Sequence, residues 1–505
     1  MNSILKPGHD HVAALESLAF ENRYIKLPAP FFHAVSPSPL MGAHLASFNE
    51  ALGALIGLTA EDASKQGFVD YFSGAREIPG AEPLAMAYAG HQFGHFVPQL
   101  GDGRAMLLGQ VRDKQGQLWD MHLKGSGPTR FSRGSDGRAV LRSSVREYLC
   151  SEAMFGLGIP TTRALCLIAS NESVIRERAE PGAMLVRMAQ SHVRFGSLEY
   201  FYHRGDHDNL RQLGEYLLAE EFAHLRDEPA PYLAMFDEVM MRTAKLVAQW
   251  QGVGFCHGVM NSDNMSIIGL TLDYGPFAFM DVFEKDHICN HSDHQGRYAY
   301  QRQPEMAHFN LACLATALLP LVDDDKEAAI ALVRERLANY WTCFNDAHLE
   351  IVRAKLGLLE QEDEDLELWN ELLQLMDGSV DFTTFFRQLS ALPSLSPSTY
   401  HPLRGEFSNV PRFDLWVYEY RQRLQREQSC DADRRKSMDA VNPKYILRNY
   451  MAEAAIRKAE DDGDYSEIDR LLKLLRAPFS EQPESQQYAE SPPAWAQSIQ
   501  LSCSS

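Results

Sequence analysis

The spacing of apolar residues changes from strand-like to helical near residue 205. Residues 1–80 mix short helical runs with Pro-interrupted segments, and from residue 81 short apolar runs of strand length alternate with turn residues. Residues 106–111 and 118–124 flank a turn at 113–116, a pattern typical of a β-hairpin. Further strands are expected at 165–168, 173–175 and 184–188.

One helix is expected among these strands. Residues 138–155 carry apolar side chains at helical spacing, and Gly156-Leu-Gly-Ile-Pro ends the pattern. After residue 205 helical spacing dominates, and helices are expected at 208–222, 232–250, 305–320, 324–356, 364–376, 411–427 and 444–475. A β-rich half followed by a helical half predicts an α+β fold of two lobes. That order admits a nucleotide in the cleft between the lobes.

These patterns divide the chain into four parts. We predict an N-terminal extension packing on the lobes at 1–80, a β-rich lobe at 81–204 and a mainly helical lobe with the catalytic loop at 205–476. Residues 477–505 contain no Lys or Arg and are rich in Pro, Ser, Gln and Glu, which is typical of a poorly ordered tail.

Composition narrows the classes of function. The 505 residues carry 48 Lys and Arg against 68 Asp and Glu, a net charge of −20 that argues against a protein coating DNA or RNA. The longest apolar stretch, 309–322, is shorter than the ~20 residues that span a bilayer. Residues 1–27 lack the apolar core of a signal peptide, and eight cysteines without a Cys-x-x-Cys pair do not indicate a disulfide scaffold. We expect a cytoplasmic protein without nucleic-acid or membrane partners.

The densest group of chemically active residues is His257-Gly-Val-Met-Asn-Ser-Asp-Asn-Met, followed by Leu272-Asp-Tyr-Gly-Pro. The apolar residues between the two segments predict a short β-hairpin, which would bring Asp263 and Asn264 close to Asp273. Carboxylate and amide oxygens suit Mg²⁺ or Mn²⁺ bound together with nucleotide phosphates. The alternative is a turn whose Asp and Asn side chains cap backbone groups.

A lysine and a glutamate precede this group in the chain. Lys124 ends the strand predicted at 118–124, and Glu147 lies on the helix predicted at 138–155. Kinases use a strand lysine held by a helix glutamate to bind nucleotide phosphates. Either residue alone is more typical of a surface charge. Their order before Asp263-Asn264 and Asp273 is what indicates a kinase-like nucleotide site.

Glycine–arginine segments add candidate phosphate contacts. Gly101-Asp-Gly103-Arg104 precedes the predicted hairpin, and Ser135-Asp136-Gly137-Arg138 opens the predicted helix. Glycines allow backbone N–H groups to approach phosphate, although both segments also read as ordinary turns. Arg187 and Arg194 lie on or just after a predicted strand, where they would meet an anion or form an internal salt bridge.

At this point the chain resembles a known family, selenoprotein O, over nearly its whole length. The likeness lies in the His257 and Leu272 segments, in Leu123-Lys-Gly-Ser-Gly-Pro-Thr and in Tyr88-Ala-Gly-His-Gln-Phe-Gly. The resemblance implies a protein-kinase-like fold that binds ATP in a flipped orientation, with the γ-phosphate buried. It also implies transfer of AMP to Ser, Thr or Tyr hydroxyls of client proteins, with release of pyrophosphate.

The resemblance also implies roles for individual residues. Asp263 would be the general base, Asn264 and Asp273 would hold Mg²⁺ or Mn²⁺, and Glu147 would orient Lys124. The implied nucleotide contacts are Gly101, Gly103, Arg104, Lys124, Asp136, Gly137, Arg187, Arg194 and Asp273.

Several features depart from an ordinary kinase. No Gly-x-Gly-x-x-Gly loop precedes the hairpin, His-Arg-Asp is absent, and Asn264 directly follows Asp263. Conventional kinase activity is therefore disfavoured. Transfer of UMP from UTP and a catalytically inactive nucleotide-binding scaffold stay open as alternatives, although a scaffold needs neither a base nor metal ligands.

Two readings concern cysteine and histidine. The spacing of His287, Cys289, His291 and His294 matches no closed zinc site that we can defend. The resemblance implies a disulfide between Cys289 and Cys503, which would make activity sensitive to redox state; a free thiol on a mobile tail is the alternative.

Overall fold

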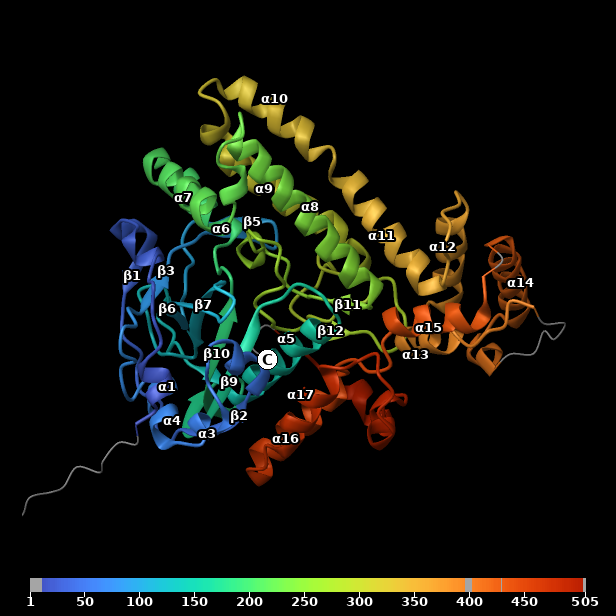
Figure 1. Cartoon of the computed structure of the whole chain (residues 1–505), viewed down its shortest axis with the longest axis horizontal. Helices are drawn as coiled ribbons and strands as arrows, with labels where there is room; N and C mark the ends of the chain where they lie inside the picture. Colours follow the sequence, from blue (N-terminus) through green and yellow to red (C-terminus); the bar gives the residue numbers. More distant parts are fainter. Residues whose placement is uncertain (1–10, 396–401, 428, 503–505) are drawn as a thin grey trace, which may run out of the picture.

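The computed structural model describes residues 11–395, 402–427 and 429–502 (Figure 1). A β-sheet-rich N-terminal region is followed by a mainly helical C-terminal half. The mixed α+β class predicted from the spacing of apolar residues is therefore confirmed.

An antiparallel sheet forms the centre of the N-terminal region. Its strands lie in the order β1-β3-β6-β7-β10-β9-β2, and β8 pairs with β10. They are β1 Phe32–Ala34, β2 His44–Phe48, β3 Leu84–Met86, β6 Ala105–Arg112, β7 Leu118–Lys124, β8 Ala139–Val140, β9 Arg163–Ile175 and β10 Ala179–Ala189. Two small ribbons lie outside this sheet, β4 Gly90–Gln92 with β5 His95–Val97, and β11 Phe255–Cys256 with β12 Ala278–Phe279.

The hairpin predicted at 106–111 and 118–124 is confirmed as β6 and β7, with Ala105 opposite Lys124. The strands predicted at 165–168 and 173–175 are one continuous strand, β9. The reason is that β10 pairs along both parts of it, with an irregularity between Pro181 and Ala183. The predicted strand at 184–188 lies within β10.

Helix α5, Leu141–Gly156, lies against the sheet on β9 and β10 and is covered on its other side by α16 and α17. The helix predicted at 138–155 is thus present. It begins three residues later than expected, because Ala139 and Val140 pair with β10 as β8. Nearly every residue of α5 is buried, which fixes the side chains that it directs toward the sheet.

Helices make up most of the remaining chain, and α8, α9 and α11 run side by side (Figure 1). In the N-terminal region they are α1 Ala13–Glu16, α2 Glu50–Leu55, α3 Ala60–Ala63, α4 Gln66–Phe72 and α6 Phe195–Tyr202. Those that follow are α7 His207–Glu220, α8 Pro231–Gly252, α9 Gln303–Val322, α10 Lys326–Leu337, α11 Tyr340–Leu356, α12 Asp365–Met376, α13 Phe382–Leu389, α14 Val410–Glu427, α15 Asp431–Val441, α16 Asn449–Asp462 and α17 Ser466–Leu475.

Two helices predicted as continuous are each divided in two. The segment 324–356 forms α10 and α11, which meet at Ala338 and Asn339. The segment 444–475 begins as a helix only at Asn449 and is interrupted after α16, where Gly463 adopts a left-handed conformation with φ of 65°. Glycine takes this conformation without steric cost and commonly ends a helix.

Helix α9 is long and strongly apolar. Residues Tyr300–Val322 are long and apolar enough to cross a membrane by length and composition, but 56% of the apolar window is buried within the protein. Because α9 packs against α6, α8 and α10, its apolar surface is accounted for by the core.

The short hairpin predicted between Asp263 and Asp273 is wrong. Within the described chain, this segment pairs with other parts of the molecule, through single bridges between Ser266 and Arg194 and between Thr271 and Thr161. The apolar side chains of Met265, Ile267 and Leu272 are buried in the core, which anchors both ends of the segment without a hairpin.

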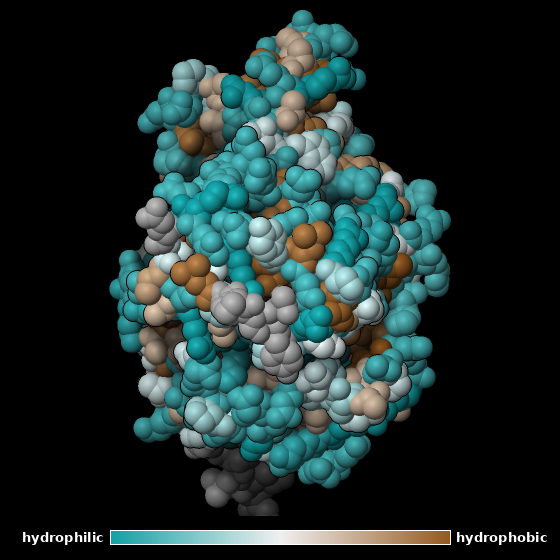
Figure 2. All heavy atoms as spheres, turned by 90° about the vertical axis from the view of Figure 1, so that its right-hand side faces the viewer, coloured by the Kyte–Doolittle hydropathy of each residue, from teal (hydrophilic) through white to brown (hydrophobic). Residues whose placement is uncertain are grey.

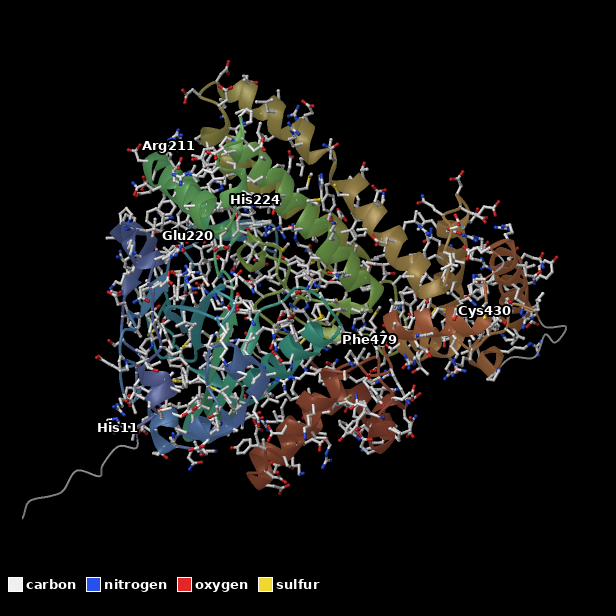
Figure 3. The ribbon with its side chains drawn as sticks, viewed as in Figure 1. His11, Arg211, Glu220, His224, Cys430 and Phe479 are labelled. Carbon is white, nitrogen blue, oxygen red and sulfur yellow. The ribbon has the colours of Figure 1, made fainter. Side chains whose placement is uncertain are left out.

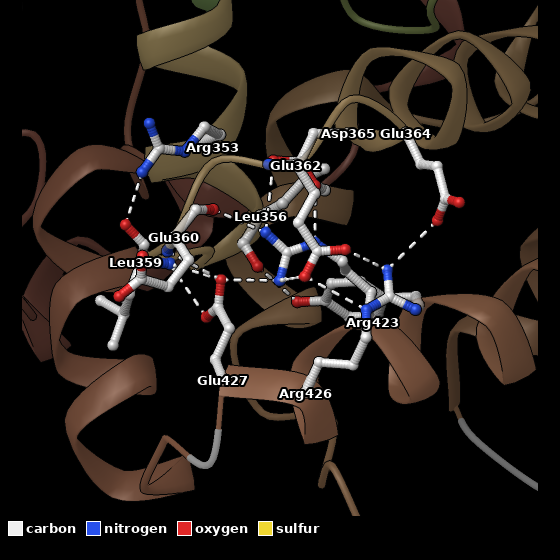
Figure 4. A network of polar contacts seen from close by, with 11 residues as sticks. Arg353, Leu356, Leu359, Glu360, Glu362, Glu364, Asp365, Arg423, Arg426 and Glu427 are labelled. Atoms are coloured by element: carbon white, nitrogen blue, oxygen red, sulfur yellow. Dashed lines mark hydrogen bonds and ion pairs between the residues drawn. The ribbon is translucent and has the colours of Figure 1, made fainter.

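Helices α11 to α15 surround a second apolar core, and a buried ion cluster ties α12 to α14 (Figure 4). Arg423 Nε lies 2.6 Å from Asp365 Oδ1, and its Nη1 lies 2.7 Å from Glu427 Oε1. The outer face on this side of the molecule is mostly hydrophilic, with small separate apolar areas (Figure 2).

Candidate active site

A cavity of about 370 Å³ collects most of the residues predicted to bind the nucleotide. Its lining carries five cationic side chains, those of Arg104, Lys124, Arg133, Arg187 and Arg194, against the carboxylates of Asp102 and Asp273. Predicted residues that line it are Gly101, Gly103, Arg104, Lys124, Arg187, Arg194, Asn264 and Asp273. An acidic protein therefore contains a locally positive pocket of the kind that phosphate groups require.

Lys124 and Glu147 meet as predicted. Lys124 ends β7 and donates a hydrogen bond from Nζ to Glu147 Oε2 on α5. Both side chains are almost fully buried. Burial lowers the pKa of Lys124, and the neighbouring Glu147 carboxylate opposes that shift. The pair holds the ammonium group at the wall of the cavity.

Arg187 and Arg194 converge on Asp273. Arg187 Nη1 lies 2.5 Å from Asp273 Oδ1, and Arg194 Nη1 donates to Oδ2. Burial alone would raise the pKa of Asp273, but Arg194 and Arg187 hold it well below its usual range. The internal salt bridge considered for these arginines is present, and all three residues also line the cavity. Asp273 has a left-handed backbone with φ of 57°, a strained conformation of the kind that clusters at functional sites.

His122 forms a hydrogen bond with Arg187 and was not predicted as a site residue from the sequence. Its Nδ1 lies 2.9 Å from Arg187 Nη2, and its Nε2 lies 3.1 Å from Asp102 Oδ2. Burial lowers the pKa of His122 to about 3, so the ring is neutral. A neutral ring that donates from Nε2 to Asp102 accepts from Arg187 at Nδ1. The sequence feature that could have pointed to His122 is the alternation of side chains along β7, which places Asp120, His122 and Lys124 on one buried face.

Asp263 lies in a short 3-10 turn, η4 Ser262–Asn264, beside the cavity. Burial raises the pKa of Asp263 to about 7, the range in which a carboxylate can accept a proton near neutral pH. Its Oδ2 accepts a hydrogen bond of 3.1 Å from Gln92 Nε2, whereas the buried Oδ1 has no partner within the described chain. Arg194 Nη1 donates to the backbone carbonyl of Asp263 at 2.8 Å, which links this turn to Asp273.

Asn264 and Asp273 fit the oxygen-donor chemistry of a divalent cation. Asn264 donates from Nδ2 to the carbonyl of Val259 at 3.1 Å, and no group in the described residues bonds its amide oxygen. That oxygen and the ionised carboxylate of Asp273 belong to residues lining one cavity. Hard oxygen ligands of this kind suit Mg²⁺ or Mn²⁺.

Asp136 and Gly137 lie outside the cavity lining. Asp136 pairs with Arg176 at 2.8 Å and caps the backbone N–H of Arg138. Gly137 is buried with φ of 66°, and a Cβ atom there would approach the carbonyl of Gly127 to 2.1 Å. In this structure Gly137 therefore permits a close backbone approach that shapes the loop after β7.

Two aromatic residues of the cavity were also missed. Tyr88 lies under Arg194, whose Cζ is 4.7 Å from the ring centroid. Phe131 packs against Gly101, where a Cβ atom would come within 2.5 Å of the ring. No periodic pattern in the sequence marks these two rings, because only the folded structure brings each ring next to the residue it contacts.

A larger hollow of about 760 Å³ lies between α16, the β9–β10 turn and the C-terminal tail. Its arginines are paired with glutamates, as in the contacts of Arg178 with Glu460 and of Arg457 with Glu453. The concentrated positive charge of the smaller cavity is absent from the described lining of this hollow.

The proposed disulfide of Cys289 involves a residue outside the described chain, Cys503. Cys289 is buried, and its thiol donates to the carbonyl of Cys256 at 3.5 Å. The tail approaches this region, because His291 donates its backbone N–H to Leu501 at 2.9 Å. Cys430 is exposed at the far end of the molecule (Figure 3).

The zinc reading of 287–294 also gains no support from the geometry. Within the described residues, the group with metal-ligating spacing is a different one, formed by His91, Glu199 and Cys313. In that group His91 Nδ1 lies 2.5 Å from Glu199 Oε2, a hydrogen bond that anchors β4 to α6.

Comparison with known proteins bears on the whole chain. Residues 14–476 match a family model described as "Protein adenylyltransferase SelO". A protein of Thioalkalivibrio sulfidiphilus named "Protein nucleotidyltransferase YdiU" is 53% identical over 492 residues, covering 97% of this chain and 99% of the relative. Proteins of the same name from Myxococcus xanthus and Azotobacter vinelandii are 52% and 49% identical, covering 98% and 97% of this chain and 100% and 99% of the relatives.

Proposed function

The chain belongs to the protein adenylyltransferase SelO family and is a protein nucleotidyltransferase, and we propose that it transfers AMP from ATP to Ser, Thr or Tyr hydroxyls of other proteins. Pyrophosphate is the second product. The proposal includes a two-lobed, protein-kinase-like arrangement, in which the sheet of residues 81–204 and the helices of 205–476 enclose the nucleotide. Of the extension predicted at 1–80, the described residues 11–80 contribute β1 and β2 to the sheet and pack on the lobes. In the proposal the activity belongs to the cytoplasm.

One observation carries the proposal. A carboxylate whose pKa burial raises to about 7, Asp263, directly precedes Asn264, which lines a cavity with five cationic side chains. In the proposed reaction Asp263 accepts the proton of the attacking hydroxyl. Lys124, Arg187 and Arg194 hold the triphosphate, with the β- and γ-phosphates deep in the cavity and the α-phosphate toward Asp263. Positively charged groups placed where charge develops supply electrostatic stabilisation of the transition state.

Two further sets of residues act on the nucleotide. Gly101, Gly103 and Arg104 contact phosphate or ribose, and Asp136 and Gly137 contact the nucleotide once it is bound, while Glu147 keeps Lys124 in place. Asn264 and Asp273 would hold Mg²⁺ or Mn²⁺, which would neutralise phosphate charge.

Transfer of UMP from UTP is the second candidate. The cavity wall described above consists mainly of groups that recognise phosphate, and these do not distinguish one nucleobase from another. A kinase and an inactive scaffold are the remaining outcomes of the test.

The test compares the position of the label. The protein is incubated with an acceptor protein and Mg²⁺ or Mn²⁺, in parallel with α-³²P-ATP, γ-³²P-ATP and α-³²P-UTP. Label on protein from α-³²P-ATP alone is expected. Label from γ-³²P-ATP would show a kinase, preferential label from UTP would show UMP transfer, and tight ATP binding without label would show a scaffold. The Asp263→Asn variant is the matched control for labelling that does not depend on the site.

A further inference from the structure

The strand β4 and the turn after it contact the loop that carries Asp263. His91 donates its backbone N–H to Ser262 Oγ at 2.7 Å. Phe93 donates its backbone N–H to Asn261 Oδ1 at 3.3 Å. Two residues of the β4 segment therefore bind two neighbouring residues of the Asp263 loop, although about 170 positions separate the segments in the sequence.

Between these two contacts, Gln92 reaches the carboxylate of Asp263 itself. Gln92 Nε2 lies 3.1 Å from Asp263 Oδ2, whereas Oδ1 is buried and has no partner within the described chain. Oδ1 faces Gly90, where an added Cβ atom would lie 2.5 Å away. The two carboxylate oxygens are thus unequal: Oδ2 is held by the Gln92 amide, and Oδ1 is enclosed against Gly90.

We propose that Gln92 is a positioning residue for the general base, fixing the orientation of the Asp263 carboxylate through its hydrogen bond to Oδ2. The inference rests on the proposed function and deepens it. As the hydroxyl O–H bond breaks, its proton passes to the Asp263 carboxylate, and the oxygen electron pair forms the bond to the α-phosphorus. The bond from that phosphorus to the bridging oxygen breaks, and its electron pair leaves with pyrophosphate.

The segment that carries Gln92 is held from its other side. The ring of His91 pairs with Glu199 on α6, whose side chain is fully buried. The turn that joins β4 to β5 places Phe93 and Gly94 at φ of 50° and 84°, the geometry of a tight hairpin turn that matches the strand twist. A catalytic base must be held within about 0.5 Å of its productive position, and these contacts restrict the movement of the segment that carries Gln92.

The test uses Gln92→Met, which is close in volume and lacks the donor. Its kcat for AMP transfer is expected to fall roughly 10- to 100-fold, the usual effect of losing one hydrogen bond to a charged group. KM for ATP should be unchanged. The matched control is His95→Leu: His95 lies opposite Gln92 in the β4–β5 ribbon, is exposed, and should leave both quantities at wild-type values.

A second measurement is independent of transfer. At one fixed pH, the carboxyl infrared band of Asp263, assigned by difference from Asp263→Asn, should lie at a different frequency in Gln92→Met than in wild type, because the hydrogen bond to Oδ2 is lost. An unshifted band, or wild-type kcat in Gln92→Met, would overturn the role of Gln92. Absence of transfer in the wild-type protein would refute the proposed function instead, and the infrared band would still decide the role of Gln92.

Discussion

Lys124 and Glu147 form an ion pair that is almost sealed from solvent, with side chains 7% and 1% exposed. A buried charge that loses its partner cannot be solvated. Removal of one member of such a pair typically costs about 3–5 kcal/mol, whereas replacement of both members by apolar residues is often neutral.

We therefore predict opposite behaviour of single and double variants at this pair. Lys124→Met and Glu147→Leu should each lower the free energy of unfolding by about 3–5 kcal/mol, and the double variant should regain most of that loss. Urea denaturation of the four proteins measures the coupling. Strictly additive losses would contradict a buried pair. All three variants should lose nucleotide transfer, since the proposal assigns phosphate binding to the Lys124 ammonium group and the placement of that group to Glu147.

The raised pKa of Asp263 predicts the pH dependence of transfer. With a pKa of about 7, the base is protonated at lower pH, and kcat should fall about tenfold per unit below neutrality. Asp263→Asn should lower kcat by roughly 10²- to 10⁴-fold and remove this limb. A flat profile of the wild type between pH 5 and 8 would contradict the assignment of Asp263 as base.

The same group should affect stability in the opposite sense. A carboxyl whose pKa is higher in the folded protein than its ordinary value of 3.8 stabilises the fold at low pH, and that contribution is lost as pH rises through about 7. Asp263→Asn should thus be more stable than wild type at pH 8, with the difference vanishing near pH 4. Thermal unfolding at both pH values measures this.

Replacement of Asp273 should separate metal binding from nucleotide binding. Asp273→Asn removes the carboxylate that neutralises Arg187 and Arg194. The cavity becomes more positive, so ATP in the presence of a chelator should bind more tightly than to wild type, while the gain in affinity that Mg²⁺ gives should be lost. Calorimetric titrations with and without Mg²⁺ check both signs, and unchanged metal dependence would exclude Asp273 as a ligand.

His122 should act on ATP binding through Arg187. His122→Asn retains an acceptor near the position of Nδ1 and should stay close to wild type in KM for ATP, whereas His122→Phe should raise KM roughly tenfold. Since His122 does not contact the attacking hydroxyl in the proposal, kcat should change less than KM. Equal KM values for the two variants would remove His122 from this role.

The ion cluster around Arg423 should matter for stability alone. Arg423 is buried against Asp365 and Glu427, so Arg423→Met should destabilise the protein by about 3–5 kcal/mol. Arg426 is 45% exposed and also contacts Glu362, so Arg426→Met should cost no more than about 1 kcal/mol. Transfer per folded molecule should be unchanged in both. A specific loss of transfer in either variant would show that this cluster communicates with the cavity.

Local patterns were enough to predict parts of the site and not others. Lys124 and Glu147 could be placed because each ends or lies on an element with clear apolar spacing. Asp263 and Asp273 could be selected by residue type, but the hairpin expected between them was wrong, because their segment pairs through single bridges with distant residues and not with itself.

Contacts between distant segments were beyond the reach of the sequence. Gln92 and Asp263 are 171 positions apart, and His122 and Arg187 are 65 apart. A single sequence contains no signal that such side chains meet. The same limit applies to residues 32–48, predicted as part of an extension, whose two short strands join the central sheet.

Those two strands have a practical consequence for truncation. β1 and β2 occupy opposite edges of the central sheet, although only residues 35–43 separate them. Crossing six strand spacings takes about 29 Å, which nine residues cover only along a near-extended path. Residues 32–48 therefore supply both edge strands of the sheet. A fragment that begins at residue 81 would leave the backbone groups of both edges unpaired and able to pair with other chains. We expect such a fragment to aggregate, and not merely to lose activity.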